Sequence, residues 1–441
     1  MDRSALSQNL EGLLAGLAPS WFGSVVSVDG SRIVVAGLSS VGRLGDRLVI
    51  EPADGERLSA ETIGVNGRHL VAYAFGPAKG VACGDRVLID RGATTISPSD
   101  DWLGSVLDWR GKRIDGTSPR SGADEFPLDA APPAAPLRKR IGERIATGHA
   151  VFDTFLPLCR GQRVGLFAGS GIGKSMLLGS LARHVEADVC VLALIGERGR
   201  EVRAFVEDTL GPQGLERAVV IASTSDESAL AKRQSARLAM ATAEYFRARG
   251  KHVLLIFDSL TRYADAHREF ALAAGEPPSL HAYPPSTFHA IASLVERAGP
   301  GAPGEGDITA IFSVLVAGSD MDEPVADIVR GVLDGHIVLD RAIAERGRFP
   351  AVNVRRSVSR SLPFAASDEE NTLLRQGRSL LAAYEEAEMI VRAGLYAAGS
   401  DPQLDQAIRT WPALDRFFTV IGDGGPQEGF AALKNIFNEK P

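Results

Sequence analysis

The sequence predicts an α/β domain that follows a small β-barrel and precedes an α-helical domain. From Gly161 onward, apolar runs alternate with helical segments, which is typical of a parallel sheet covered by helices on both faces. Residues 21–91 contain short β-rich runs separated by turn residues, the pattern of a small barrel. After Pro363 only helical periodicity remains. The predicted boundaries are 1–20 for an N-terminal helix, 21–95 for the barrel, 96–365 for the α/β domain and 366–441 for the helical domain.

The bulk composition indicates a soluble, cytoplasmic protein of several domains. The 441 residues exceed what one compact core accommodates, and 45% hydrophobic with 23% charged residues is typical of globular proteins. The longest apolar runs are too short to span a bilayer, and the N-terminus lacks the apolar core of a secretory signal. Three cysteines without metal-ligand spacing favour a reducing compartment: Cys83, Cys159 and Cys190. The net charge of −7 disfavours nucleic-acid binding.

Residues 1–18 place leucines at helical spacing among polar residues, which predicts a short amphipathic helix. A helix of this length is marginal alone, so it needs a surface to pack on. That surface is either the protein's own barrel or a partner protein, and the sequence leaves both open.

The barrel and the segment after it are predicted from short runs. The five barrel runs are Gly23–Val28, Arg32–Ala36, Asp46–Ile50, His69–Ala74 and Asp85–Asp90. Trp102–Gly116 is expected to form two strands around a turn at Arg110-Gly111. Residues 118–136 are rich in Pro, Ala, Ser and Asp, as in a linker.

The α/β domain and the C-terminal domain account for the rest of the chain. The predicted strands are Val164–Phe167, Val189–Ile195, Ala218–Ala222, Val253–Phe257 and Ile308–Val316. The predicted helices are Ser228–Arg249, Pro285–Ala298, Asp368–Ala398, Pro402–Val420 and Phe430–Asn438.

A glycine-rich turn between the first of these strands and the next helix predicts a phosphate-binding loop. Its residues are Ala168, Gly169, Ser170, Gly171, Ile172, Gly173, Lys174 and Ser175, followed by Met176. Backbone N–H groups and a helix N-terminus suit an anion, Lys174 suits the β and γ phosphates, and Ser175 suits Mg²⁺. Ala168 departs from the glycine that opens the usual pattern. The alternative is an ordinary turn with a solvated lysine.

Two carboxylates follow predicted strands. Asp258 ends the apolar run Val253–Phe257, at the sheet edge where open α/β folds bind ligands, and is expected to join the Mg²⁺ shell. It would otherwise cap the following turn. Glu197 follows Val189–Ile195 and is placed to activate a water molecule, with arginines nearby to keep it ionised. A surface salt-bridge cluster is the alternative for Glu197.

Arg360 lies in the short polar segment Ser357–Arg360, and its guanidinium is suited to stabilise charge during phosphoryl transfer. The sequence leaves open whether it meets its own nucleotide or that of a neighbour. Phe349 is a candidate for stacking on adenine or, alternatively, a core residue.

Seven ordered segments resemble the ATPase of the flagellar type III export apparatus: LFAGSGIGKS, ALIGERGREVR, ASTSDESALAKRQSA, LLIFDSLTRYADAHRE, AGEPPS, DEPVADIVRGVLDGHIVL and RFPAVNVRRSVSR. Virulence type III secretion ATPases and rotary ATP synthase subunits are further relatives. The resemblance implies an N-terminal β-barrel, a RecA-like P-loop ATPase core and a C-terminal helical domain. It also implies ATP hydrolysis coupled to protein export.

The resemblance also implies roles for particular residues. Lys174 and Ser175 would bind phosphate and Mg²⁺, with Asp258 as the acidic residue of the second nucleotide-binding motif and Glu197 as the catalytic carboxylate. Arg198 and Arg262 match positions near the phosphates, and Phe349 matches an adenine-side aromatic. Arg360 matches an arginine finger that crosses a subunit boundary.

The resemblance further implies a homohexameric ring at the cytoplasmic face of the inner membrane. A regulatory stator-like protein at the N-terminal helix, a stalk protein, the export gate and chaperone-cargo complexes are the implied partners. A virulence secretion ATPase, a rotary synthase subunit and a hexameric nucleic-acid translocase are the alternatives. Glu197 beside the loop favours a hydrolytic chain over a structural synthase subunit, and the acidic charge disfavours the translocase.

Overall fold

The computed structural model describes residues 21–53, 55–279, 282–316, 321, 323–422 and 424–438. The expected N-terminal amphipathic helix lies outside the described residues. The chain forms two compact units, which are described separately. The first contains the described residues up to Thr95 together with Leu272–Glu276, and the second contains Ile96–Ala271 and the residues from Pro277 onward.

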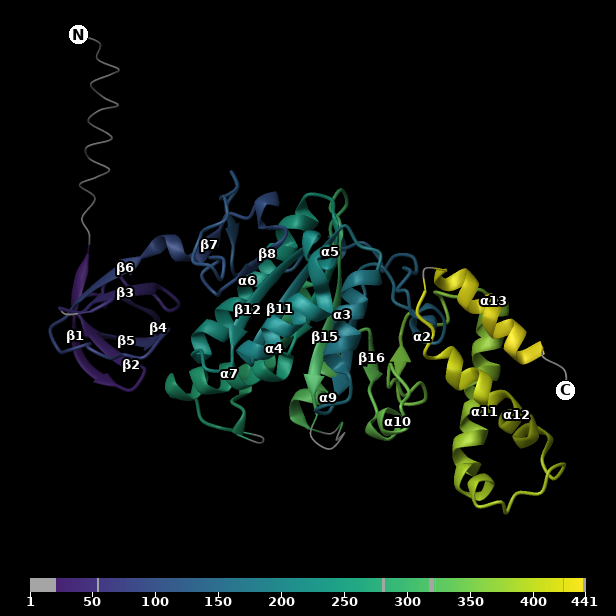
Figure 1. Ribbon diagram of the computed structural model, residues 1–441. Coiled ribbons are helices and arrows are strands. Elements are labelled where there is room, and N and C mark those ends of the chain that lie inside the picture. Colours follow the sequence, from purple (N-terminus) through teal and green to yellow (C-terminus); the bar gives the residue numbers. More distant parts are fainter. Residues whose placement is uncertain are drawn as a thin grey trace, which may run out of the picture. The chain divides into compact units, whose positions relative to one another are not determined.

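The first unit is a closed antiparallel barrel with strand order β1-β2-β5-β4-β3-β6 (Figure 1). The strands are β1 (Phe22–Asp29), β2 (Arg32–Ala36), β3 (Arg47–Glu51), β4 (Leu58–Asn66), β5 (His69–Ala74) and β6 (Arg86–Asp90). Alternate residues, such as Ile33 and Val35 of β2, point inward and are fully buried. The barrel prediction is confirmed, and its five predicted runs are all strands. Strand β4 was not predicted.

The second unit is built on a mainly parallel sheet with the order β17-β16-β10-β15-β13-β11-β12-β8. The strands are β8 (Ser105–Leu107), β10 (Arg163–Ala168), β11 (Val189–Glu197), β12 (Ala218–Thr224), β13 (His252–Asp258), β15 (Asp307–Leu315), β16 (Gly335–Val338) and β17 (Val358–Ser359). Only β17 and the short β14 (Gly299–Pro300), which pairs with β15, run antiparallel to their neighbours. The α/β prediction is confirmed.

For Trp102–Gly116 the predicted first strand and the turn at Arg110-Gly111 are confirmed, but the predicted second strand is not. Trp102 ends a 3-10 turn, Asp100–Trp102, and the strand that follows pairs in parallel with β12. The second half contributes only a single bridge, Leu107 to Arg113. The reason is tertiary: the central sheet buries Leu107 completely, which a local two-stranded hairpin would not do.

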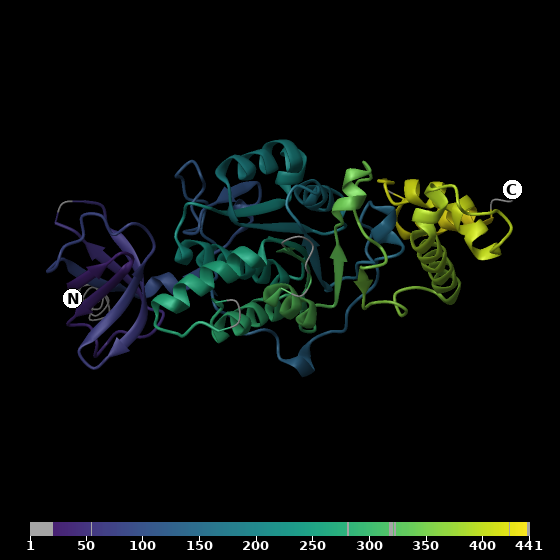
Figure 2. The ribbon, with the colours of Figure 1, turned by 90° about the horizontal axis from the view of Figure 1, so that it is seen from below.

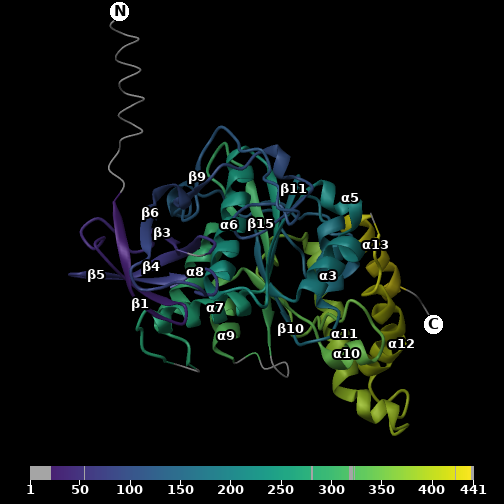
Figure 3. The same ribbon diagram turned by 60° about the vertical axis from the view of Figure 1, so that its left-hand side comes forward.

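Helices cover both faces of the sheet (Figure 3). One face packs against α3 (Lys174–His184), α4 (Gly199–Ala204), the π-helical turn Phe205–Leu210 and α5 (Gly211–Glu216). The other packs against α6 (Ala229–Ala248), α7 (Leu260–Ala273), α8 (Pro285–Arg297) and α9 (Pro324–Val332). The alternation along β11 serves both faces, because Leu192 joins one core and Val191 the other.

Short elements complete this unit. They are the helices α2 (Ala150–Asp153) and α10 (Arg341–Glu345), the strand β9 (Phe126–Pro127) and a 3-10 turn at Ala135–Leu137. The 3-10 turn Arg91–Thr94 ends the first unit, and strand β7 (Thr95–Ile96) lies at the boundary between the two units.

Three C-terminal helices, α11 (Asp368–Arg392), α12 (Pro402–Phe417) and α13 (Gly425–Asn438), lie together (yellow-green to yellow in Figure 2). Ser367 and Glu370 form a capping box that starts α11, and Asp401 caps α12. The three predicted helices are confirmed, although α11 ends at Arg392 rather than at Ala398. No helix of the described residues is both long and apolar enough to cross a membrane.

Candidate active site

The glycine-rich loop joins β10 to α3, as the sequence predicts. Gly171 and Gly173 have φ angles of +76° and +86°, in the left-handed region where only glycine is free of strain. Gly173 also leaves little room for a side chain, since an added Cβ would lie 3.1 Å from Cδ1 of Phe349. The loop therefore turns sharply and leaves the N-terminus of α3 at the pocket, where its free N–H groups favour an anion.

The loop borders a cavity of about 630 Å³. Ala168–Gly171, Gly173–Met176, Glu197, Arg198 and Arg262 line it. Ile172 is buried beneath the loop, at 3% exposure, and does not line the cavity. The structure thus brings together most of the predicted site residues from the ends of β10 and β11 and the start of α7.

One ammonium group lies between two carboxylates at the base of the site. Lys174 Nζ forms an ion pair with Asp258 Oδ1 and lies 3.8 Å from Glu197 Oε1. Ser313 Oγ donates a hydrogen bond of 2.6 Å to the same Asp258 oxygen. Burial and the charge of Asp258 raise the pKa of Glu197, whereas Lys174 opposes that rise. Lys174, rather than the arginines that the sequence suggested, is the cation that favours the charged form of Glu197, and it offsets only part of the rise in the pKa.

The donors present fit a magnesium ion. Ser175 is exposed at the start of α3 and lines the cavity, and Asp258 ends β13 with its carboxylate buried. A hydroxyl and a carboxylate are hard oxygen ligands, which Mg²⁺ prefers. The described residues hold no cluster of three His, Cys, Asp or Glu that would form an all-protein metal cage. That suits Mg²⁺, which is usually held by one or two protein groups plus phosphate and water.

Arg198, Arg262 and Phe349 surround this centre. Arg198 is largely exposed and donates to Glu201 at 2.7 Å. Arg262 packs over Gly196, where an added Cβ would lie 3.2 Å from the arginine Cβ. Phe349 is 51% exposed and lies against the loop at Gly173, so it is not a core residue.

Arg360 lies outside the cavity of its own chain. Its backbone N–H donates to Asp334 O at 3.0 Å, and Asp334 pairs with Arg163 at the first residue of β10. The loop follows the last residue of that strand, so at about 3.3 Å per residue the two sites are roughly 20 Å apart along β10. Arg360 and the phosphate loop therefore lie at opposite edges of one sheet.

Several residues that contact the site were not predicted, among them Ser313, Thr261 and Arg341. Ser313 is a polar residue in the mainly apolar strand β15, but Asp307 and Thr309 lie in the same strand, so the sequence does not distinguish Ser313. Thr261 Oγ1 accepts a hydrogen bond from Leu315 N at 2.9 Å and lines the cavity. Arg341 donates to the loop carbonyl of Ser170 at 3.1 Å. Neither Thr261 nor Arg341 has a sequence pattern that distinguishes it.

Two family models match the chain. Residues 148–359 match the nucleotide-binding domain of the ATP synthase alpha/beta family. Residues 366–419 match the C-terminal domain of the type III secretion ATPase EscN. The matches cover the region of the cavity and the two longer C-terminal helices.

Similar proteins cover nearly the whole chain. The flagellum-specific ATP synthase of Caulobacter vibrioides is 45% identical over 90% of this chain and 91% of its own length. That of Salmonella typhimurium is 43% identical over 89% of each chain. Among solved structures, the assembled ATPase EscN of the enteropathogenic E. coli type III secretion system is 35% identical, with a TM-score of 0.85 over 94% of this chain and 100% of its own. The structure of EscN in complex with its central stalk EscO gives the same identity, TM-score and coverage.

Proposed function

The chain belongs to the flagellum-specific ATP synthases within the ATP synthase alpha/beta family, and from this premise we propose that it hydrolyses ATP to drive export of flagellar proteins through a type III secretion apparatus. The observation that supports this most directly is the position of Lys174, which lies at the glycine loop between Asp258 and Glu197. The identities to flagellar relatives, 45% and 43%, exceed the 35% identity to EscN, so the flagellar role is favoured over the virulence role.

The loop and Lys174 would bind the phosphates of ATP. Backbone N–H groups of Gly169–Gly173 and the start of α3 would donate to phosphate oxygens, while Lys174 would exchange part of its contact with Asp258 for the β and γ phosphates. Ser175 and Asp258 would hold Mg²⁺, which when bound neutralises charge that builds up on the phosphate oxygens.

Glu197 would act as the general base. It ends β11 beside Lys174 with its side chain 21% exposed, so it is held in place but still reachable by water. It would accept the proton of the water that attacks the γ-phosphate. Arg198 and Arg262, which line the cavity, would contact the phosphates. Phe349, whose ring lies against Gly173 of the loop, would support the adenine.

Arg360 would serve the pocket of a neighbouring copy. Arg360 lies at the opposite end of β10 from the glycine-rich loop of its own chain. Its guanidinium would therefore meet the γ-phosphate bound by the loop of a second chain. Repeating this heterologous contact closes a ring. We therefore propose a homohexamer at the cytoplasmic face of the inner membrane.

The remaining proposals concern domains and partners. As the sequence predicts, we propose a barrel domain over 21–95, an ATPase domain over 96–365 and a helical domain over 366–441, with residues 1–20 as the docking segment for a stator-like regulator. The relative EscN binds a central stalk, and we propose a corresponding stalk protein, the export gate and chaperone-cargo complexes as partners here. No nucleic-acid partner is expected.

The proposal is tested by ATPase activity as a function of protein concentration. Specific activity should rise between nanomolar and micromolar protein as complete sites form between copies. Arg360→Ala and Lys174→Ala chains should each be inactive alone and regain activity when mixed, since one supplies the loop and the other the arginine. Constant specific activity together with no gain on mixing would contradict the shared site.

A further inference from the structure

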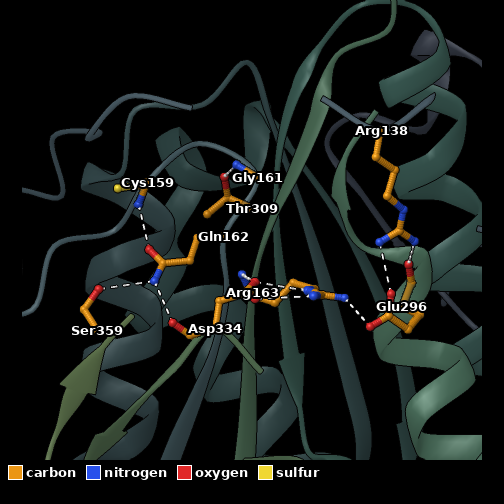
Figure 4. Close-up of polar contacts among 9 residues, drawn as sticks. All are labelled: Arg138, Cys159, Gly161, Gln162, Arg163, Glu296, Thr309, Asp334 and Ser359. Atoms are coloured by element: carbon orange, nitrogen blue, oxygen red, sulfur yellow. Dashed lines mark hydrogen bonds and ion pairs between the residues drawn. The ribbon is translucent and has the colours of Figure 1, made fainter. Parts of the chain in front are cut away.

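Gln162 is a fully buried glutamine whose side chain makes three hydrogen bonds at the amino edge of the sheet (Figure 4). Its Oε1 accepts from Cys159 N at 2.9 Å. Its Nε2 donates to Asp334 O at 3.1 Å and to Ser359 Oγ at 3.2 Å. Buried amides must be satisfied, so this geometry constrains every group that it contacts.

Both donor bonds of Gln162 end next to Arg360. Ser359 is the residue before Arg360, and its hydroxyl in turn donates to Pro157 O at 2.9 Å. The Asp334 carbonyl that accepts from Gln162 also accepts from Arg360 N at 3.0 Å. The Gln162 amide therefore contacts both the residue that precedes Arg360 and the carbonyl that accepts the Arg360 N–H.

The Asp334 end of this contact is itself fixed. The Asp334 carboxylate accepts from Arg163 N at 3.0 Å and from Arg163 Nε at 3.1 Å, and Arg163 Nη1 lies 2.8 Å from Glu296 Oε1 (Figure 4). Arg138 completes the chain with a contact of 3.0 Å to Glu296 Oε2. Asp334 is thus bound to the start of β10, the strand that carries the phosphate loop at its other end.

The short strand just before Arg360 has few other anchors. β17 is only two residues long and pairs with β16 through Gly335 and His336. It comes so close at Gly335 that an added Cβ would lie 2.6 Å from Val358 O. The Arg360 side chain is exposed, and its contact with Arg330 O is 3.4 Å long. The direction in which the guanidinium leaves the surface is therefore set by the backbone.

We propose that Gln162 is a positioning residue for Arg360, which it holds in the orientation needed to reach the nucleotide of the neighbouring copy. The inference rests on the proposed function of Arg360. In this arrangement Gln162 directly precedes β10, the strand that leads to the chain's own glycine-rich loop, but it acts on the pocket of the neighbouring copy.

The test uses Gln162→Met, which keeps the size of the side chain and removes the amide. A displacement of about 1 Å can cost roughly 10²-fold in rate, so kcat should fall about 10²-fold while ATP affinity stays within about threefold. Mixing identifies the affected half of the site. Gln162→Met should regain activity with Lys174→Ala, which carries an intact Arg360, and should gain nothing with Arg360→Ala.

Two further variants guard against a folding defect. Ser359→Ala removes the hydroxyl that Gln162 contacts and should show the same mixing pattern with a smaller loss, about tenfold. Thr309→Val is the matched control, because Thr309 is equally buried at this edge and bonds Gly161 N at 2.9 Å without touching the Arg360 segment. Its kcat should stay within about threefold of the parent.

The outcomes separate the two proposals. Rescue of Gln162→Met by Arg360→Ala, or by neither chain, overturns the positioning role. If the reference pair Arg360→Ala and Lys174→Ala fails to regain activity, the shared site itself is wrong. If that pair recovers and Gln162→Met does not, only the role of Gln162 is overturned.

Discussion

Replacement of Glu197 by glutamine should separate ATP binding from hydrolysis. The two side chains have the same size, and Lys174 retains its closer partner Asp258 when the 3.8 Å contact with Glu197 is lost. The ground state should therefore change little, and ATP affinity should stay within about threefold. Turnover should fall because an amide does not accept the proton of the attacking water.

The expected loss of turnover in Glu197→Gln follows from the general-base role of Glu197. A positioned general base contributes about 10²–10⁴ in rate, which is about 3–5 kcal/mol of barrier at 1.36 kcal/mol per decade. Phosphate release at saturating ATP would give kcat, and titration with a fluorescent ATP analogue would give affinity. The purified variant should hold intact ATP that an acid quench recovers unhydrolysed.

Glu207→Gln is the matched control. Glu207 pairs with Arg203 at 2.9 Å on the exposed segment after the pocket, so the same chemical change there should leave kcat within about twofold. A Glu197→Gln enzyme with kcat within threefold of the parent would refute the general-base role. A loss of ATP affinity greater than about thirtyfold would show instead that Glu197 shapes the binding site.

Three further outcomes follow from the structure. Lys174→Ala should weaken ATP binding about 10–100-fold in a fluorescence titration, because a charge-assisted contact worth about 1.5–3 kcal/mol is lost; unchanged affinity would contradict the phosphate role. Burial lowers the pKa of His149 and of His252 to about 4. As the pH falls below about 6.5, these histidines are protonated in the unfolded chain before they are protonated in the folded one, so the folded state should lose stability. The loss should be about 2 kcal/mol per histidine at pH 5. Thermal melts from about pH 7.5 to 5 would measure this, and a flat Tm would contradict it. Arg297→Met should cost about 3–5 kcal/mol in urea unfolding because it leaves the buried Glu244 without its bidentate partner, and adding Glu244→Met should restore most of that loss.

The strands of the core were predictable because burial on both faces gives uniform apolar runs. β11 and β13 are buried along nearly their whole length, and their sequences contain almost no polar residue before Glu197 and Asp258. Strand β4 was missed because it is not alternating: Ala60, Glu61, Thr62 and Ile63 are all buried, and a register shift lies within it.

The site was predictable where one short segment carries the chemistry. The phosphate loop needs glycines at fixed positions, so Gly171 and Gly173 are visible in the sequence. Contacts between distant segments were not predictable: Ser313 meets Asp258 from 55 residues away, and Gln162 meets Ser359 from 197 residues away. Only the strand order brings such pairs together, and no local pattern encodes it.

The separation of Lys174 and Arg360 on opposite edges of one sheet has a consequence for assembly. If Arg360 serves the neighbouring copy, as proposed, an open string of copies would leave one terminal pocket without an arginine and one terminal arginine without a pocket. Such a string would have one working pocket fewer than it has chains, and closure into a circle would supply the missing one. In a closed circle, a single copy that lacks only Arg360 would inactivate the pocket of one neighbour and leave the other pockets active.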